Sequence, residues 1–215
     1  MSDAPPPPAA KEPLKGGELI NTVGFWRIVG EDFRQHRKKI LLPGFQALFV
    51  YRFGTWADTI KFRPFALVMK AVYYAAYVFV RNIYGIEFEK TIKAGRRIEL
   101  GHQNGMVIHK FAEIGDDVLI RHNVTFGAGV EWTHLQGPKI GSNVTFSPGV
   151  VVVGNVTIGD NVSIGPNCVI TSDVPSGRTL FVPPPRALPK PDRLADTPEQ
   201  KTGISDPPSG QNQKE

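Results

Sequence analysis

The stretch that decides the fold reads IHKFAEIGDDVLIRHNVTFGAGV at 108–130 and KIGSNVTFSPGVVVVGNVTIGDNVSIGPNCVITSDV at 139–174. Large apolar side chains return at six-residue steps, and a small or β-branched side chain follows each one four residues later. The large positions are Ile108, Ile114, Ile120, Phe126, Ile140, Phe146, Val152, Ile158, Ile164 and Ile170. The small positions are Ala112, Val118, Val124, Val130, Val144, Val150, Val156, Val162, Cys168 and Val174. Helices repeat at about 3.6 residues and strands at two, whereas a parallel β-helix of hexapeptide turns repeats at six. The sequence therefore predicts a mainly β chain that coils as a parallel β-helix.

Two breaks interrupt this rhythm, and each of them contains a histidine. The first lies between Ile98 and Ile108, which are ten residues apart, and contains His102. The second covers 130–139 and contains His134. Because irregular loops on a rigid scaffold are where functional groups concentrate, we expect the functional site at these breaks.

The 215 residues divide by composition into four parts. Residues 1–17 and 187–215 are rich in Pro, Lys, Glu, Ser and Gln, a composition that predicts disordered tails. Between them, we expect an N-terminal helical region at 18–84 and the β-helix domain at 85–186.

The helical region contains apolar residues near helical spacing and two prolines suited to a first helical turn. Three helices are expected, at 25–37, 43–60 and 64–83. In the third, only Lys70 interrupts an apolar run from Phe65 to Val80. This run is shorter than the roughly 20 residues needed to cross a bilayer. We expect the helix to be buried in a subunit contact, and the alternative is a helix that lies on a membrane surface.

Charge and cysteine content limit the partners and the compartment. The net charge is +5, and the segment 21–100 carries fourteen Lys and Arg against six Asp and Glu. Such a surplus suits an anionic membrane or a phosphorylated cofactor, and no nucleic-acid-reading motif accompanies it. The single Cys168 excludes an internal disulfide framework and occupies a repeat position that predicts burial. No signal-peptide pattern occurs in 1–15, so we expect a cytoplasmic protein with at most peripheral contact to the inner face of the membrane.

Four stretches resemble the catalytic domain of serine acetyltransferases, within the hexapeptide-repeat acyltransferases. They are YGIEFEKTIKAGRRIELGHQNGMVI at 84–108, IGDDVLIRHNVTFGAG at 114–129, GPKIGSNVTFSPGVVVVGNVTIGDNVSIGPNCVITSDVP at 137–175 and VPPPR at 182–186. The resemblance covers about half of the chain, from Glu87 to Arg186. It implies a left-handed β-helix, a homotrimer with active sites between subunits, and acetyl-CoA as the acetyl donor. A higher oligomer through the N-terminal helices is a further expectation.

The resemblance also implies a catalytic pair. His102 aligns with the family's catalytic histidine, and Glu87 aligns with its acidic partner, which is usually Asp. Transfer of an acetyl group to an alcohol needs a base, and an imidazole, with an ordinary pKa near 6.5, can accept the hydroxyl proton. A carboxylate can hold such a ring in one tautomer and stabilise the imidazolium that forms.

Three positions depart from the family pattern. The acidic residue that usually precedes the catalytic histidine is replaced by Gly101, and an Arg-His pair is replaced by Gln136 and Gly137. In the family these residues hold the ammonium and carboxylate groups of serine. Because a buried ionic substrate without partners is unfavourable, we expect a hydroxyl of a sugar or polysaccharide precursor as acceptor. The alternative is a true serine O-acetyltransferase of cysteine biosynthesis.

The acceptor and the cofactor have further candidate contacts. An aromatic face with hydrogen-bonding groups suits a sugar ring, and we expect the acceptor to contact Glu131, Trp132, His134 and Gln136. By the resemblance, acetyl-CoA lies along the β-helix. Its candidate contacts are Ala128, Lys139, Pro148, Pro166, Thr171, Ser172 and Arg186.

Two non-transferase hypotheses remain. A zinc enzyme that resembles γ-class carbonic anhydrases needs three histidines at a subunit boundary. The candidates for such a site are His102, His109, His122 and His134, but their spacing does not match that family's pattern, so we expect no metal. A non-catalytic β-helix scaffold is the other alternative, and it predicts no binding of acetyl-CoA.

Overall fold

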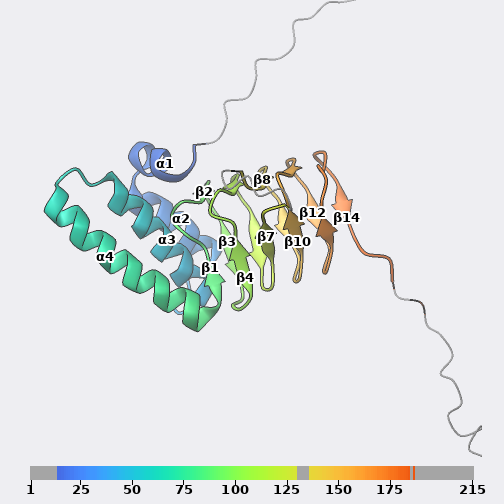
Figure 1. Cartoon of the computed structure of the whole chain (residues 1–215), viewed down its shortest axis with the longest axis horizontal. Helices are drawn as coiled ribbons and strands as arrows, with labels where there is room; N and C mark the ends of the chain where they lie inside the picture. The colour runs from blue at the N-terminus through green and yellow to red at the C-terminus, as the bar shows by residue number, and fades with distance from the viewer. Residues whose placement is uncertain (1–13, 130–135, 185, 187–215) are drawn as a thin grey trace, which may run out of the picture. The chain divides into compact units, whose positions relative to one another are not determined.

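The computed structural model describes residues 14–129, 136–184 and 186. The described residues up to Val182 form one unit, and Pro183, Pro184 and Arg186 belong to a second. In the first unit, helices gather at one end of a β-helix (Figure 1). Among the described residues, all β-ladders are parallel, and they form three sheets. The predicted left-handed parallel β-helix with an N-terminal helical region is confirmed.

Each of the first four coils contributes one short strand to each sheet, and the last coil contributes strands to the first and third sheets only. The first sheet contains β1 (Ile86–Glu87), β4 (Met106–Ile108), β7 (Thr125–Gly127), β10 (Val151–Val153) and β13 (Val169–Ile170). The second contains β2 (Lys93–Ala94), β5 (Glu113–Ile114), β8 (Lys139–Ile140) and β11 (Thr157–Ile158). The third contains β3 (Glu99–Gly101), β6 (Leu119–Arg121), β9 (Thr145–Phe146), β12 (Ser163–Ile164) and β14 (Thr179–Leu180).

The six-residue rhythm arises because the repeat positions point into the coil. Ile114, Phe126 and Phe146 are at most 1% exposed, and the two phenylalanine rings meet edge to face with centroids 4.9 Å apart. Burial of each such side chain contributes roughly 1.5–3 kcal/mol. The predicted burial of Cys168 is also confirmed.

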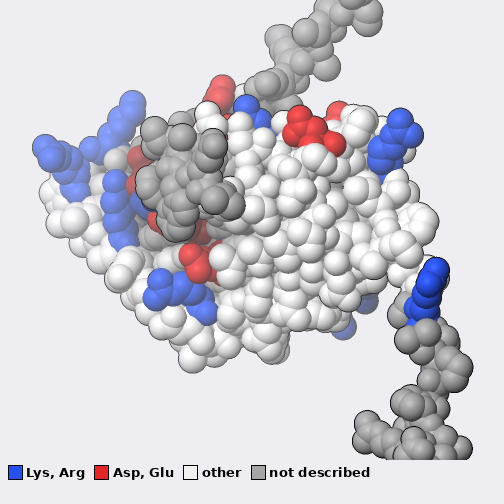
Figure 2. Space-filling view, turned by 45° about the vertical axis from the view of Figure 1, so that its right-hand side comes forward, with Lys and Arg blue, Asp and Glu red and all other residues white. Residues whose placement is uncertain are grey.

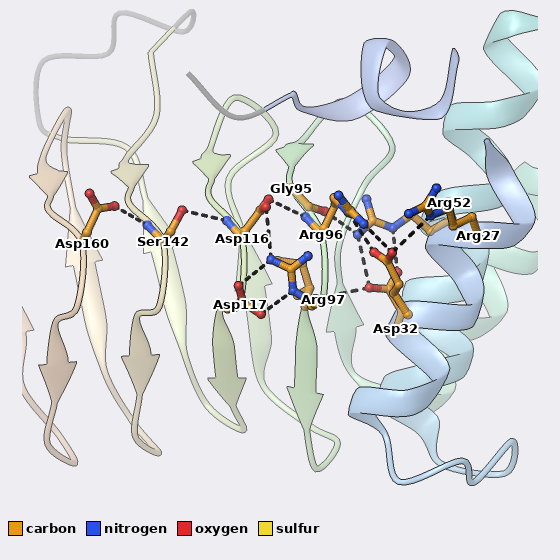
Figure 3. Close-up of polar contacts among 12 residues, drawn as sticks. Arg27, Asp32, Arg52, Gly95, Arg96, Arg97, Asp116, Asp117, Ser142 and Asp160 are labelled. Atoms are coloured by element: carbon orange, nitrogen blue, oxygen red, sulfur yellow. Dashed lines mark hydrogen bonds and ion pairs between the residues drawn. The ribbon is translucent and has the colours of Figure 1, made fainter. Parts of the chain in front are cut away.

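The corners explain the recurrent Asn, Asp and Gly. Asp117, Asn143 and Asn161 have φ of 55–57°, the left-handed region that these short polar side chains tolerate. Along one corner, side chains also accept backbone N–H groups of the preceding coil (Figure 3). Asp116 Oδ1 accepts from Arg96 N–H at 2.8 Å, and Asp160 Oδ1 accepts from Ser142 N–H at 2.6 Å.

From residue 14 onward, four helices precede the β-helix: α1 (Gly16–Val23), α2 (Phe25–Gln35), α3 (Pro43–Thr59) and α4 (Arg63–Phe79). A π-helical turn at Val80–Tyr84 continues α4. The last three match the helices expected at 25–37, 43–60 and 64–83. Helix α1 was not predicted, and it begins two residues inside the expected tail at 1–17. Residues 1–13, 130–135 and 187–215 lie outside the described residues.

A buried ion pair joins the helices to the first coil. Arg52 of α3 lies with its Nε 2.8 Å from Asp32 Oδ2 on α2, and both side chains are at most 2% exposed. Arg52 also donates to the carbonyl oxygen of Gly95, and Asp32 accepts the backbone N–H of Ile98 (Figure 3). Because each partner also satisfies backbone groups, the pair fixes both helices against the start of the β-helix.

Helix α4 buries little of its apolar surface. Ala66, Tyr73 and Tyr77 are buried, whereas Leu67 is 72% and Tyr74 is 66% exposed. In the described part of the chain, no helix is both long and apolar enough to cross a membrane. A subunit contact or a membrane-surface contact of α4 stays a prediction.

Candidate active site

His102 lies in a turn that the first coil enlarges by two residues. Ile86 pairs with Met106, twenty positions later, whereas Val107 pairs with Thr125, eighteen positions later. The extra residues fall between β3 and β4, where His102 has a φ of 70° and Asn104 a φ of 78°. Asn tolerates this region, whereas a larger side chain such as His102 is strained there by roughly 1–3 kcal/mol, and such strained residues cluster at functional sites. The register break seen in the sequence is therefore an outward turn that presents an exposed imidazole.

A cavity of about 490 Å³ adjoins this turn. One wall comes from the connection between α2 and α3 and from the start of α3, and the other comes from β3, the His102 turn and the next coil. The lining residues are His36, Arg37, Lys39, Leu42, Pro43, Gly44, Glu99, Leu100, Gly101, His102, Gln103 and His122. The two walls touch closely at Gly44, where a Cβ would overlap the carbonyl oxygen of Leu100.

His36 fixes the helical wall against β3. Its ring is buried, Nδ1 lies 2.7 Å from the carbonyl oxygen of Asp32, and the backbone N–H of Leu100 lies 3.1 Å from Nε2. Because Nε2 accepts the Leu100 hydrogen bond, Nδ1 carries the proton and donates to Asp32. His36 therefore has a structural role. It fastens the helical wall to Leu100, which lies two residues before His102 on the opposite wall.

His122 is the third histidine that lines the cavity, after His36 and His102. Gly101 pairs with Arg121, so His102 and His122 follow paired residues in successive coils. Their rings meet edge to face, with centroids 5.6 Å apart and an interplanar angle of 83°. Nδ1 of His122 is buried and has no hydrogen-bond partner among the described residues. Sequence reasoning considered His122 only as a zinc ligand; the signal it missed is the twenty-residue spacing from His102, which equals the length of the first coil.

Comparisons with known proteins agree with this architecture. A family model described as bacterial transferase hexapeptide (six repeats) matches residues 137–172. The serine acetyltransferase of Helicobacter pylori is 36% identical over 156 residues, which are 71% of this chain and 87% of that relative. The chain belongs to the serine acetyltransferase family. As a member of this family it is an acyltransferase.

Other members of the serine acetyltransferase family are longer. The Salmonella typhimurium enzyme is 32% identical over 71% of this chain, but the match spans only 53% of that relative. A solved serine acetyltransferase isoform 3 from Entamoeba histolytica, in complex with cysteine, has a TM-score of 0.64 at 22% identity, covering 80% of this chain and 64% of its own. The Brucella abortus enzyme in complex with coenzyme A has a TM-score of 0.64 at 22% identity, covering 77% of this chain and 68% of its own. These structural likenesses support the fold.

Glu87, the expected partner of His102, lies on β1 and pairs with Val107 of β4. Its side chain is exposed and makes no hydrogen bond with His102 within the described part of this chain. It lies near Tyr77 of α4, where burial, followed by the carboxylates of Glu87 and Glu89, raises the pKa of the phenol to about 12. The orienting role of Glu87 stays a prediction.

Two of the positions that depart from the family pattern differ in the space around them. A Cβ at Gly137 would lie 2.7 Å from the backbone carbon of Phe111, so a larger side chain needs a backbone shift. A Cβ at Gly101 would lie 3.4 Å from Leu119 Cδ1, an ordinary contact. A histidine at position 137 would therefore require the backbone to move, whereas position 101 would accept an acidic residue without such a shift.

The other expected contacts to the acceptor and to acetyl-CoA stay predictions. Glu131, Trp132 and His134 lie outside the described residues, and Gln136 is exposed. The cofactor candidates Ala128, Lys139, Pro148 and Pro166 follow the β-helix away from the His102 cavity. Thr171 and Ser172 line a separate cavity of about 360 Å³ beside β14, and Arg186 belongs to the second unit. Within the described ranges, no three His, Cys, Asp or Glu residues are grouped as a metal site needs.

Proposed function

We propose that the protein transfers the acetyl group of acetyl-CoA to a hydroxyl group, with His102 as the general base. The observation that carries the proposal is the place of His102, in a left-handed turn that borders a cavity of about 490 Å³. Membership of the serine acetyltransferase family and the likeness to a relative crystallised with coenzyme A support acetyl-CoA as donor.

The proposed reaction needs the imidazole of His102 beside the hydroxyl group of the acceptor. The acceptor O–H transfers its proton to a ring nitrogen of His102 while the oxygen attacks the thioester carbonyl carbon. The C–S bond then breaks, and the imidazolium returns the proton to the leaving thiolate. The products are the acetyl ester and free coenzyme A. General base catalysis of this kind contributes roughly 10²–10⁴-fold to the rate.

The assembly belongs to the proposal. We take the protein to be a homotrimer, with acetyl-CoA bound along the β-helix next to the exposed side of His102. The Glu87 carboxylate would orient the His102 ring and stabilise the imidazolium. Lys139 would supply positive charge for the phosphates of the cofactor.

L-serine is the first acceptor to test. The relatives at 32–36% identity are named serine acetyltransferases, whereas no comparison supports the sugar acceptor that the sequence led us to expect. The sugar stays a second candidate because one observation favours it: with the backbone of Phe111 where it lies, the family's histidine would not fit at Gly137 without a backbone shift.

Release of free thiol from acetyl-CoA tests the proposal. The purified full chain is assayed with L-serine and with a panel of sugars and nucleotide sugars. We expect acceptor-dependent thiol release in the wild-type protein and its loss in His102→Asn. Thiol release that does not depend on any acceptor, or an His102→Asn variant as active as wild type, would overturn it.

A further inference from the structure

The cavity beside His102 has a positively charged wall. Arg37 and Lys39 line it, and Glu99 is the single carboxylate among its lining residues. Neither cation forms an ion pair with any described residue. By contrast, Arg52, Arg96 and Arg97 are all paired with carboxylates. Figure 2 shows Lys and Arg gathered at the helical end, while the β-helix surface in this view carries few charges.

The turn that carries Arg37 and Lys39 is held in place. The backbone N–H of Lys38 donates to the carbonyl oxygen of Phe33 over 2.9 Å, and that of Lys39 donates to His36 over 3.1 Å. Arg37 and Lys38 both have a φ near 57°, a left-handed conformation that non-glycine residues rarely adopt. Together with the buried His36, these bonds fix the backbone that carries Arg37 and Lys39 relative to β3, the strand that leads into His102.

Helix α3 adds to the positive potential. It begins at Pro43, and Leu42, Pro43 and Gly44 line the cavity. The first N–H groups of a helix have no intrahelical partner and carry the positive end of its dipole. The positive charges of Arg37, Lys39 and this helix end exceed the negative charge of Glu99, so the potential in the cavity is positive. A concave site concentrates this field.

We infer that the acceptor carries an anionic group, a carboxylate or a phosphate, which Arg37 and Lys39 bind so that its hydroxyl lies at His102. The inference rests on the proposed function and names the substrate class of the same site. Arg37 and Lys39 would thus provide the charged partners for an acceptor carboxylate that the family's Arg-His pair, here Gln136 and Gly137, no longer provides. Where the acceptor also has an ammonium group, Glu99 would face it. L-serine, a hexuronic acid and a hexose phosphate share this anionic chemistry.

The test compares Arg37→Gln, Lys39→Gln and the double variant with Lys38→Gln, whose residue belongs to the same turn but does not line the cavity. All three side chains are exposed, so the folded chain should be retained, and Arg37→Lys checks rescue by a conserved charge. Initial rates are measured with L-serine, a hexuronic acid, a hexose 6-phosphate and the neutral hexose, and the KM for acetyl-CoA is measured in parallel.

We expect KM for the anionic acceptor to rise about tenfold in each single variant, since a charge-assisted hydrogen bond contributes at least about 1.4 kcal/mol. The kcat, the KM for acetyl-CoA and all values for Lys38→Gln should change less than about twofold, and Arg37→Lys should restore most of the affinity. A neutral hexose that the wild type uses as well as any anionic acceptor would overturn the inference. So would a rise in the KM for acetyl-CoA alone.

A binding measurement separates this inference from the proposed function. Titration calorimetry of inorganic phosphate and of L-serine into wild type and double variant needs no turnover. Binding that the double variant loses, in a protein that acetylates nothing, would refute the proposed function and retain the anion site. Turnover with unchanged anion binding in the double variant would retain the function and refute the anion site.

Discussion

The imidazole ring of His122 lies edge-on to that of His102, with ring centroids 5.6 Å apart, and its Nδ1 is buried without a partner among the described residues. We expect His122 to position the His102 ring. In His122→Asn, which removes the packing ring, kcat should fall about tenfold, the effect of roughly 1.4 kcal/mol, with KM nearly unchanged. His122→Phe, which keeps the ring contact, should retain more activity. An equal loss of kcat in both variants would assign the effect to a ring nitrogen of His122 and not to packing of the ring. The pH–rate profiles of both variants should then differ from that of the wild type.

The two residues of the expected catalytic pair should differ in effect. His102→Ala should lower kcat by roughly 10²–10⁴-fold because the base is lost. Glu87→Gln should lower it less, since an orienting carboxylate leaves the proton acceptor in place. Thiol release at saturating acceptor measures both. A larger loss in Glu87→Gln than in His102→Ala would contradict the assignment.

Gly44 should tolerate no side chain. A Cβ there would overlap the carbonyl oxygen of Leu100, one wall of the cavity. We expect Gly44→Ala to destabilise the protein by about 1–3 kcal/mol and to raise KM for the acceptor. Gly30→Ala in α2 is the matched control, because a Cβ there meets nothing closer than 4.0 Å. Urea unfolding should show the control to be as stable as wild type or more so.

The buried pair of Arg52 and Asp32 should be critical for stability. Arg52→Met leaves the Asp32 carboxylate buried without its partner, and loss of one member of such a pair typically destabilises by about 3–5 kcal/mol. Arg97→Gln is the control, since Arg97 and its partner Asp117 are 33% and 40% exposed and an exposed pair contributes about 1 kcal/mol or less. Similar urea midpoints for the two variants would contradict this ranking.

Acid should weaken the contacts that the first coil makes with the helices and with the next coil. The hydrogen bond from Arg96 holds the pKa of Glu31 below its ordinary value of 4.5, and that from Arg97 holds the pKa of Asp117 below 3.8. Each folded carboxyl binds a proton less readily than the unfolded one, so its contribution is complete above the ordinary pKa and is lost as the pH falls through the lowered one. The free energy of unfolding should therefore decline below about pH 4.5. In Arg96→Gln, urea unfolding across this range should show a shallower decline, and an unchanged slope would refute the assignment.

Much of the fold could be predicted because its information is local. In a β-helix each coil repeats the same inward positions, so the spacing of residues such as Ile114, Phe126 and Phe146 predicts the architecture. The extra residues around His102 appear as a break in that spacing. Helix α1 escaped prediction because Gly16 and Gly17 at its start resemble a flexible tail. The functional role of His122 could not be predicted without the pairing register that stacks it on His102.

By itself, the sequence determined the coiled β architecture, the burial of Cys168 and the turn that exposes His102, because each depends on residues close together in the chain. Only the tertiary structure decided what surrounds that histidine. Arg37, Lys39 and Gly44 lie about sixty positions before it, and they reach the cavity because the buried Arg52–Asp32 pair and the His36–Leu100 hydrogen bond hold the helices against the first coil. No local spacing encodes that contact, since it arises from packing between two separately formed elements.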